Sequence, residues 1–255
     1  MPQQLLVLFL SFQLTTNVGG YWGKIIGGHE VKPHSKPYIA YLEVQDVGLP
    51  FRCGGFLVRE DFVVTAAHCN GHITVTLGAH DISKKEATQQ KLQVESYYPH
   101  PEYNGFVLLN DILLLKLRKR AVLNENVTVI KLSKSNEDVP DGTKCVLAGW
   151  GSVTANGRRV PKKLQEVNIT VLDWSKCKQI YNRHLTSDMM CAGYEEGACI
   201  GDSGSPLVCQ DTVQGIVSFG RSPCANRTPT VFTQISKYTN WIHEIMAKKS
   251  DILYS

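Results

Sequence analysis

The chain has 255 residues, 43% of them apolar, and a formal net charge of +4. This size supports one or two domains with a substantial core. The mildly basic balance permits adhesion to anionic glycans or membranes, but without a recognition motif for nucleic acid it argues against a nucleic-acid-binding protein.

The first twenty residues have the pattern of a secretory signal peptide, although the usual positive charge at the start is missing. The apolar run 5–10 is followed by polar residues and the small-residue end Val18-Gly19-Gly20. A membrane anchor needs about 20 apolar residues, so this run is too short for a membrane span. We expect residues 1–20 to be a signal peptide, cut after Gly20 or Trp22, and the protein to be secreted or stored in a secretory granule.

Short β-forming runs separated by turn signals follow Tyr38 and indicate an all-β barrel or sandwich. A helix is predicted near the end of the chain, where apolar residues recur at helical spacing over 235–246, and a shorter one over 173–182. The candidate strands are 38–44, 62–65, 73–77, 92–94, 112–117, 144–147, 167–172, 206–209, 213–218 and 230–234.

Eight cysteines also indicate an extracellular or granule protein. No Cys-x-x-Cys pair is present, so zinc binding is the weaker interpretation. Spacing alone leaves 105 possible disulfide pairings open. The cysteines occupy positions 53, 69, 145, 177, 191, 199, 209 and 224.

The segment Gly201-Asp202-Ser203-Gly204-Ser205-Pro206 places a serine between glycines, where its hydroxyl and nearby N–H groups suit acyl transfer. By itself this pattern is equally typical of a plain turn. Two upstream motifs favour the catalytic interpretation: Thr65-Ala66-Ala67-His68-Cys69, and Asn110-Asp111 before an apolar run. His, Asp and then Ser is one chain order in which a catalytic triad occurs.

With these motifs together, the chain resembles the trypsin/chymotrypsin family of serine proteases from Ile25 to about Lys249. Segments 32–38, 76–80 and 215–218 are most similar to its granzyme, mast-cell chymase and duodenase branch. The resemblance implies an all-β fold of two six-stranded antiparallel β-barrels with the active site between them. It places the barrels at about 25–132 and 143–234, a C-terminal α-helix at about 235–248 and a tail at 250–255.

The resemblance also implies a role for each site residue. His68 would accept the proton of the nucleophile Ser203, Asp111 would orient His68, and the N–H groups of Gly201 and Ser203 would form the oxyanion hole. The implied disulfides are Cys53–Cys69, Cys145–Cys209, Cys177–Cys191 and Cys199–Cys224. The implied substrate-binding residues are Gly197, Ala198, Ile200, Ser218, Phe219, Gly220 and Thr230.

Residues 21–24 would be an activation propeptide. Cleavage after Lys24 would free the amine of Ile25, which would move inward and pair with Asp202. The protein would then be a zymogen that needs this cut for activity.

The expected specificity pocket is neutral, because Gly197 and Thr230 occupy the positions that carry charge in relatives. A neutral pocket that Gly220 leaves open favours a large apolar P1 residue, whose burial contributes roughly 1.5–3 kcal/mol. The bulk of Thr230 makes an elastase-like preference for smaller residues the second choice. A third alternative is that Glu196, in the short loop with Glu195, reaches the pocket and attracts a basic residue.

Three departures from the family pattern stand out. Ser205 replaces a glycine and would strain the loop if the position requires a glycine-only conformation. Phe219 replaces a tryptophan. Ala79 and Gln89 replace the carboxylates of the trypsin calcium loop, so no metal and no cofactor are expected.

The leading interpretation is an active endopeptidase, expected to be a monomer, with protein or peptide substrates and protease inhibitors as partners. A weakly active relative acting as a cationic binding protein is the alternative, and a disulfide-rich structural module comes third. Basic clusters at 84–85, 116–120 and 158–163 are either solvated loops or a face for an anionic glycosaminoglycan. Sequons at Asn126, Asn168 and Asn226 are candidate glycosylation sites.

Overall fold

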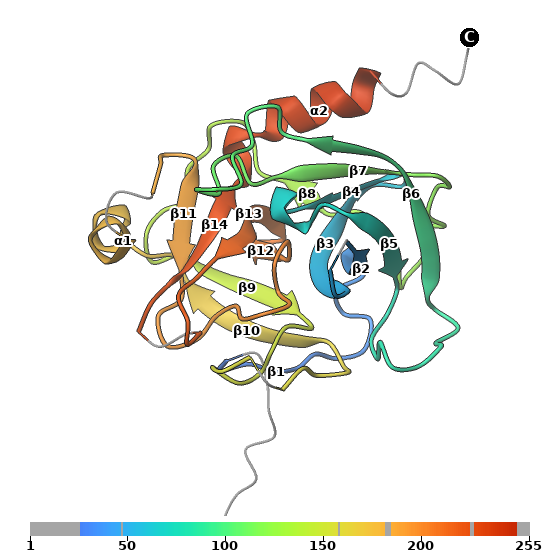
Figure 1. Cartoon of the computed structure of the whole chain (residues 1–255), viewed down its shortest axis with the longest axis horizontal. Coiled ribbons are helices and arrows are strands. Elements are labelled where there is room, and N and C mark those ends of the chain that lie inside the picture. The colour runs from blue at the N-terminus through green and yellow to red at the C-terminus, as the bar shows by residue number, and fades with distance from the viewer. Residues whose placement is uncertain (1–25, 47, 158, 182–184, 225–226, 249–255) are drawn as a thin grey trace, which may run out of the picture.

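A computed structural model describes residues 26–46, 48–157, 159–181, 185–224 and 227–248. The expected signal peptide, the propeptide, Ile25, Asn226 and the tail lie outside these residues. Two β structures lie side by side in Figure 1, with α2 (Thr239–Lys248) across one edge of the molecule. Within the described part of the chain, no helix is long and apolar enough to cross a membrane.

The first β structure is a closed antiparallel barrel of six strands. Its apolar residues point inward, and side chains such as Leu42, Phe56 and Phe62 have no solvent exposure. In barrel order the strands are β2 (Ile39–Gln45), β3 (Phe51–Arg59), β4 (Phe62–Thr65), β7 (Leu113–Leu117), β6 (Gln90–Pro99) and β5 (His72–Leu77).

The second β structure, called the second barrel below, is an eight-stranded sheet whose ends approach each other. An isolated β-bridge between Val171, just after β10, and Ala192 of β11 joins the two ends of this sheet. The first barrel is instead closed by a continuous ladder between β2 and β5. Leu147, Leu207 and Phe232 fill its core. The order is β1 (His29–Glu30), β10 (Gln165–Thr170), β9 (Lys144–Gly149), β12 (Pro206–Cys209), β13 (Thr212–Phe219), β14 (Thr230–Gln234) and β11 (Met189–Ala192), with β8 (Lys131–Leu132) parallel to β13.

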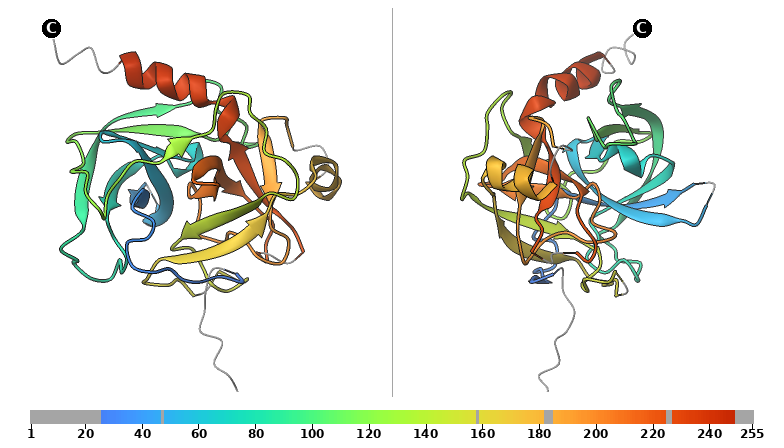
Figure 2. Two further views of the ribbon diagram at one scale, coloured as in Figure 1. Left: turned by 180° about the vertical axis from the view of Figure 1, so that it is seen from behind. Right: turned by 60° about the vertical axis from the view of Figure 1, so that its left-hand side comes forward.

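Both predicted helices are present at the periphery of the molecule, as Figure 2 shows. The shorter one is α1 (Trp174–Tyr181). The C-terminal helix α2 begins at Thr239, because residues 235–237 form a 3-10 turn instead. Tyr238 and Ile242 pack into the core of the first barrel, so the C-terminal helix contacts the first barrel although it follows the second in the sequence.

The four disulfides join the cysteine pairs that the family resemblance implies. They are Cys53–Cys69, Cys145–Cys209, Cys177–Cys191 and Cys199–Cys224. Each closes a loop of the unfolded chain and contributes roughly 2–4 kcal/mol of stability. The first of them fixes β3 to the turn that carries His68, and the last joins two loops that flank Ser203.

Candidate active site

His68 and Asp111 meet at one end of the first barrel. β4 and β7 are antiparallel neighbours, and Thr65 pairs with Leu113, so the residues just after β4 lie beside those just before β7. His68 Nδ1 lies 2.7 Å from Asp111 Oδ2, and the His68 backbone N–H donates to Asp111 Oδ1 at 2.9 Å. These two contacts fix both the position and the ring orientation of the histidine.

The second barrel also holds Asp111, which has no solvent exposure. Ser218 at the end of β13 donates its hydroxyl to Asp111 Oδ2 at 2.5 Å, and Thr233 of β14 donates to the Asp111 carbonyl at 2.9 Å. Buried carboxylate oxygens need such partners. The family resemblance implied Ser218 only as a substrate-binding residue. Thr233 was not predicted, because no local motif indicates which residues of one barrel contact the other.

Ser203 lies in a loop that is pressed against the first barrel. The N–H of Gly54 on β3 donates to the Ser203 carbonyl at 2.7 Å. Gly204 has a φ of +80°, and a Cβ there would lie 2.2 Å from Thr65 Oγ1. Only glycine therefore fits directly after the serine, which explains part of the Gly-Asp-Ser-Gly pattern.

The Ile200–Gly201 peptide has a defined orientation. Its carbonyl accepts the Ser152 N–H at 2.8 Å. Because the carbonyl and N–H of a trans peptide point in opposite directions, the Gly201 N–H faces away from Ser152. Gly201 has a φ of +97°, a conformation that favours glycine.

Asp202 is completely buried between two glycines of the second barrel. Burial raises the pKa of its carboxyl to about 7, although the N–H groups of Cys199 and Gly151 donate to it and act in the opposite direction. A Cβ at Gly149 or Gly151 would lie within 2.3 Å of this carboxylate. The chain segment after Ile25 also runs nearby, since Ile26 pairs with Gly197.

Ser205 does not have the strained backbone that its replacement of glycine suggested, because its φ is not positive. Its side chain has no solvent exposure, and its hydroxyl has no hydrogen-bond partner among the described residues. Space for that hydroxyl comes from Gly54 and Gly149, where an added Cβ would lie 2.0 and 3.1 Å from Ser205 Oγ. The cost of the substitution is therefore an unsatisfied buried hydroxyl rather than a strained backbone.

A cavity of about 240 Å³ opens beside Ser203. Gly197 is the one predicted pocket residue that does not line it, because Thr230 Oγ1 lies in front of it, 2.8 Å from where a Gly197 Cβ would be. The cavity lining also includes residues that were not predicted from the sequence: Val217, Arg221, Ser222, Thr228 and Pro229. The predicted residues that line it are Ala198, Ile200, Ser218, Phe219, Gly220 and Thr230.

Neither acidic residue of the short loop lines this cavity. Glu195 is exposed and lies 3.6 Å from Arg227. Glu196 is also exposed, and its side chain packs over Gly27, where a Cβ would lie 2.4 Å from Glu196 Cγ. The alternative in which Glu196 enters the pocket therefore finds no support in the structure.

Known proteins resemble the chain over nearly its whole length. The trypsin family profile matches residues 25–242. Mast cell protease 3 of Ovis aries is 46% identical over 94% of this chain and 96% of its own length, and duodenase-1 of Bos taurus is 45% identical over 95% and 97%. A solved structure titled "Structure of GrC" is 43% identical, with a TM-score of 0.83, and covers 88% of this chain and 100% of its own.

The family profile, the curated relatives and the solved structure all indicate the same family, and the two β structures that meet near Ser203 are consistent with it. The chain belongs to the trypsin family of serine proteases and is a serine endopeptidase.

Proposed function

We propose that Ser203, His68 and Asp111 form the catalytic triad of this endopeptidase. The observation that carries the proposal is the His68–Asp111 pair, held from the second barrel by Ser218, beside a cavity lined by Ser203. Ser203 Oγ attacks the scissile carbonyl while His68 takes the hydroxyl proton and then gives it to the leaving amine. Water repeats these steps on the acyl-enzyme and regenerates the serine.

The oxyanion of the tetrahedral intermediate binds the backbone N–H groups of Gly201 and Ser203 in this proposal. The hydrogen bond from Ser152 to the Ile200 carbonyl supports it, because that bond directs the Gly201 N–H to the opposite side of the peptide. Donors fixed in this way need no reorganisation during the reaction.

The proposal includes secretion as a zymogen. Cleavage after Lys24 frees the amine of Ile25, and this ammonium pairs with Asp202. The buried carboxyl, whose pKa burial raises to about 7, supports this step, because a buried carboxylate without a cation is costly. Pairing then holds the loop that contains Asp202 and Ser203 in place.

The preferred P1 residue in this proposal is large and apolar, as in chymotrypsin. Support comes from the cavity, whose lining contains no carboxylate among the described residues. A buried P1 cation needs such a partner. The cation in that lining, Arg221, donates to the Ile180 carbonyl and lies over the ring of Tyr181. Thr230 occupies the base and accepts the Ala198 N–H at 3.2 Å, which makes the cavity shallower and leaves an elastase-like preference as the alternative.

A peptide library with a varied P1 residue, digested by the processed enzyme, tests this preference. We expect cleavage after Phe, Tyr, Leu or Met. A preference for Val or Ala favours the elastase-like alternative, and a preference for Arg or Lys contradicts the neutral-pocket proposal. Negligible turnover of every peptide, together with no reaction with a serine-directed phosphonate, supports the weakly active cationic binding protein.

A second proposed function is adhesion to a sulfated glycosaminoglycan. The specific observation is that two basic clusters, distant in the sequence, come together. The Ile82 N–H donates to the Lys162 carbonyl at 2.8 Å, and the backbones of Asp81 and Lys163 form an antiparallel β-bridge. Exposed Lys84, Lys85 and Lys162 thus share one side of the barrel interface. Replacing these three lysines with alanine should lower the salt concentration that elutes the protein from heparin, whereas replacing Lys144 and Lys176 should not.

The sequons are proposed glycan sites of unequal accessibility. Asn168 is exposed on β10, while Asn126 is half-buried. Mass spectrometry of the secreted protein, before and after enzymatic deglycosylation, shows which of them carries a glycan.

A further inference from the structure

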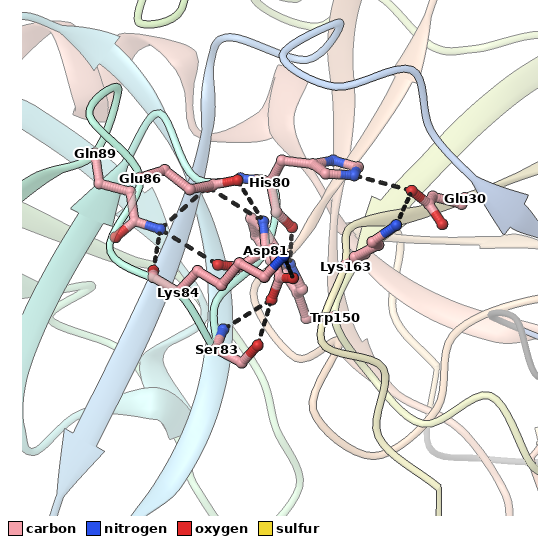
Figure 3. Close-up of polar contacts among 9 residues, drawn as sticks. All are labelled: Glu30, His80, Asp81, Ser83, Lys84, Glu86, Gln89, Trp150 and Lys163. Atoms are coloured by element: carbon pink, nitrogen blue, oxygen red, sulfur yellow. Dashed lines mark hydrogen bonds and ion pairs between the residues drawn. The ribbon is translucent and has the colours of Figure 1, made fainter.

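A polar network joins the two barrels (Figure 3). Glu30 of β1 contacts His80 Nε2 at 3.1 Å and Lys163 Nζ at 3.0 Å. His80 begins the surface loop 80–89 of the first barrel. Within that loop, Gln89 donates to Glu86 and to two backbone carbonyls, so the loop is closed by its own hydrogen bonds.

The peptide between His80 and Asp81 is held on both sides. Its carbonyl accepts the indole N–H of Trp150 at 3.1 Å, and also the Leu164 N–H at 2.9 Å. Its N–H donates to the carboxylate of Glu86 at 3.2 Å, and that carboxylate accepts the His80 N–H at 2.7 Å. Burial raises the pKa of Glu86, but these N–H donors outweigh it and lower the pKa below its usual value. The acceptor for Trp150 therefore has a fixed position.

Trp150 connects this network to the loop that carries the nucleophile. Its ring is buried and lies edge-on to Tyr41, with 5.6 Å between centroids. The next residue, Gly151, donates its N–H to Asp202 at 2.8 Å, and Ser152 donates to the Ile200 carbonyl at 2.8 Å. The three consecutive residues Trp150, Gly151 and Ser152 thus contact the loop 80–89 and, in the loop that carries Ser203, both Asp202 and the Ile200 carbonyl.

We propose that Trp150 is a positioning residue for the oxyanion hole, through the hydrogen bond from its indole N–H to the His80 carbonyl. The inference rests on the proposed function. With the indole anchored, Gly151 and Ser152 keep the positions in which they hold Asp202 and the Ile200–Gly201 peptide. Without the anchor, the Gly201 N–H is no longer directed at the site where charge develops in the transition state, so the loss falls on catalysis rather than on substrate binding.

The variant Trp150→Phe in the processed enzyme tests this inference, because it keeps an aromatic ring and removes the N–H donor. We expect kcat to fall about tenfold, in the range of one buried hydrogen bond, with KM changed less than about twofold. A peptide aldehyde, which adds to Ser203 and forms an oxyanion, should lose affinity by the same factor as kcat. The matching peptide alcohol, which forms no oxyanion, should bind as before.

Two further variants make the result interpretable. Trp241→Phe is the matched control, since Trp241 lies on α2 and its ring contacts His100, away from both the network and the cavity; it should leave kcat and both affinities unchanged. Glu86→Gln weakens the hold on the His80–Asp81 peptide from the surface loop, without touching Asp202 or Ile200. It should also lower the affinity for the aldehyde and leave the affinity for the alcohol unchanged, but with a smaller loss than in Trp150→Phe. It serves as the test if Trp150→Phe fails to fold.

The outcomes separate this inference from the proposed function. Equal losses of aldehyde and alcohol affinity overturn the positioning role while leaving the triad intact. Unchanged kcat in Trp150→Phe does the same, as does unchanged kcat in Glu86→Gln if Trp150→Phe fails to fold. A processed wild-type protein that neither hydrolyses peptides nor reacts with a serine-directed phosphonate rejects the proposed function itself, and the inference with it.

Discussion

At the scale of single residues, the structure explains how the protein accommodates a serine at a position where the family pattern implies glycine. Ser205 keeps an ordinary backbone conformation, and the glycines at positions 54 and 149 provide the space for its hydroxyl. The substitution therefore does not strain the backbone. Its cost is that the buried Ser205 hydroxyl has no hydrogen-bond partner among the described residues.

We predict that Ser205→Ala stabilises the protein by about 1 kcal/mol, because it removes a buried hydroxyl without a partner in the described structure. Chemical denaturation of the two proteins measures the difference. Ser205→Gly should change kcat little, since there is no strain to relieve; a large gain in rate would show that the backbone at this position is strained after all.

Asp202 gives a second prediction at this scale. Its folded-state pKa of about 7 lies above the ordinary value of 3.8. For such a group the favourable contribution to stability is complete below the unfolded-state pKa and is lost as the pH rises through the folded-state pKa. In the unprocessed protein, Asp202→Asn should therefore gain stability relative to wild type between about pH 4 and pH 7, by several kcal/mol.

Processing should reverse this effect. Once the Ile25 ammonium pairs with Asp202, the carboxylate has its counter-charge, and Asp202→Asn should lose both stability and nearly all activity. Thermal unfolding of both forms across this pH range is the measurement. A stability difference that does not depend on pH in the unprocessed form contradicts the assignment.

At the scale of secondary-structure elements, the sequence predicted ten strands and both helices because alternation, apolar runs and helical spacing depend on local residues. β3 escaped prediction because Arg52 and the pair Gly54-Gly55 interrupt its apolar pattern. In the structure that pair has a tertiary reason: a side chain at Gly54 would collide with Ser205. β11 was missed because all four of its residues are buried and show no alternation.

This close approach of β3 to the nucleophile loop leads to a prediction. Gly54→Ala should destabilise the protein by about 1–3 kcal/mol, since the new Cβ would lie 2.0 Å from Ser205 Oγ. The double variant Gly54→Ala with Ser205→Gly removes that hydroxyl and should recover part of the loss. Denaturation of the two single variants and the double variant gives the coupling energy; strict additivity would mean that the two residues do not compete for this space.

At the scale of the whole molecule, the site lies where two barrels meet, and that junction sets the limits of prediction. His68, Asp111 and Ser203 carry recognisable local motifs, so the sequence could single them out as candidates. The contacts of Ser218 and Thr233 with Asp111, and of Trp150 with His80, join residues 70 to 122 positions apart and have no local signature. Only the packing of one barrel on the other reveals them.

The measurement that tests the central claim most directly is mass spectrometry of the processed protein after reaction with a phosphonate carrying a large apolar P1 group. We predict one adduct, on Ser203, in the form that begins at Ile25. It should be absent from His68→Ala and from the unprocessed protein, and peptide hydrolysis should disappear in Ser203→Ala. An adduct on another residue, or peptide hydrolysis that persists in Ser203→Ala, would contradict the proposed mechanism.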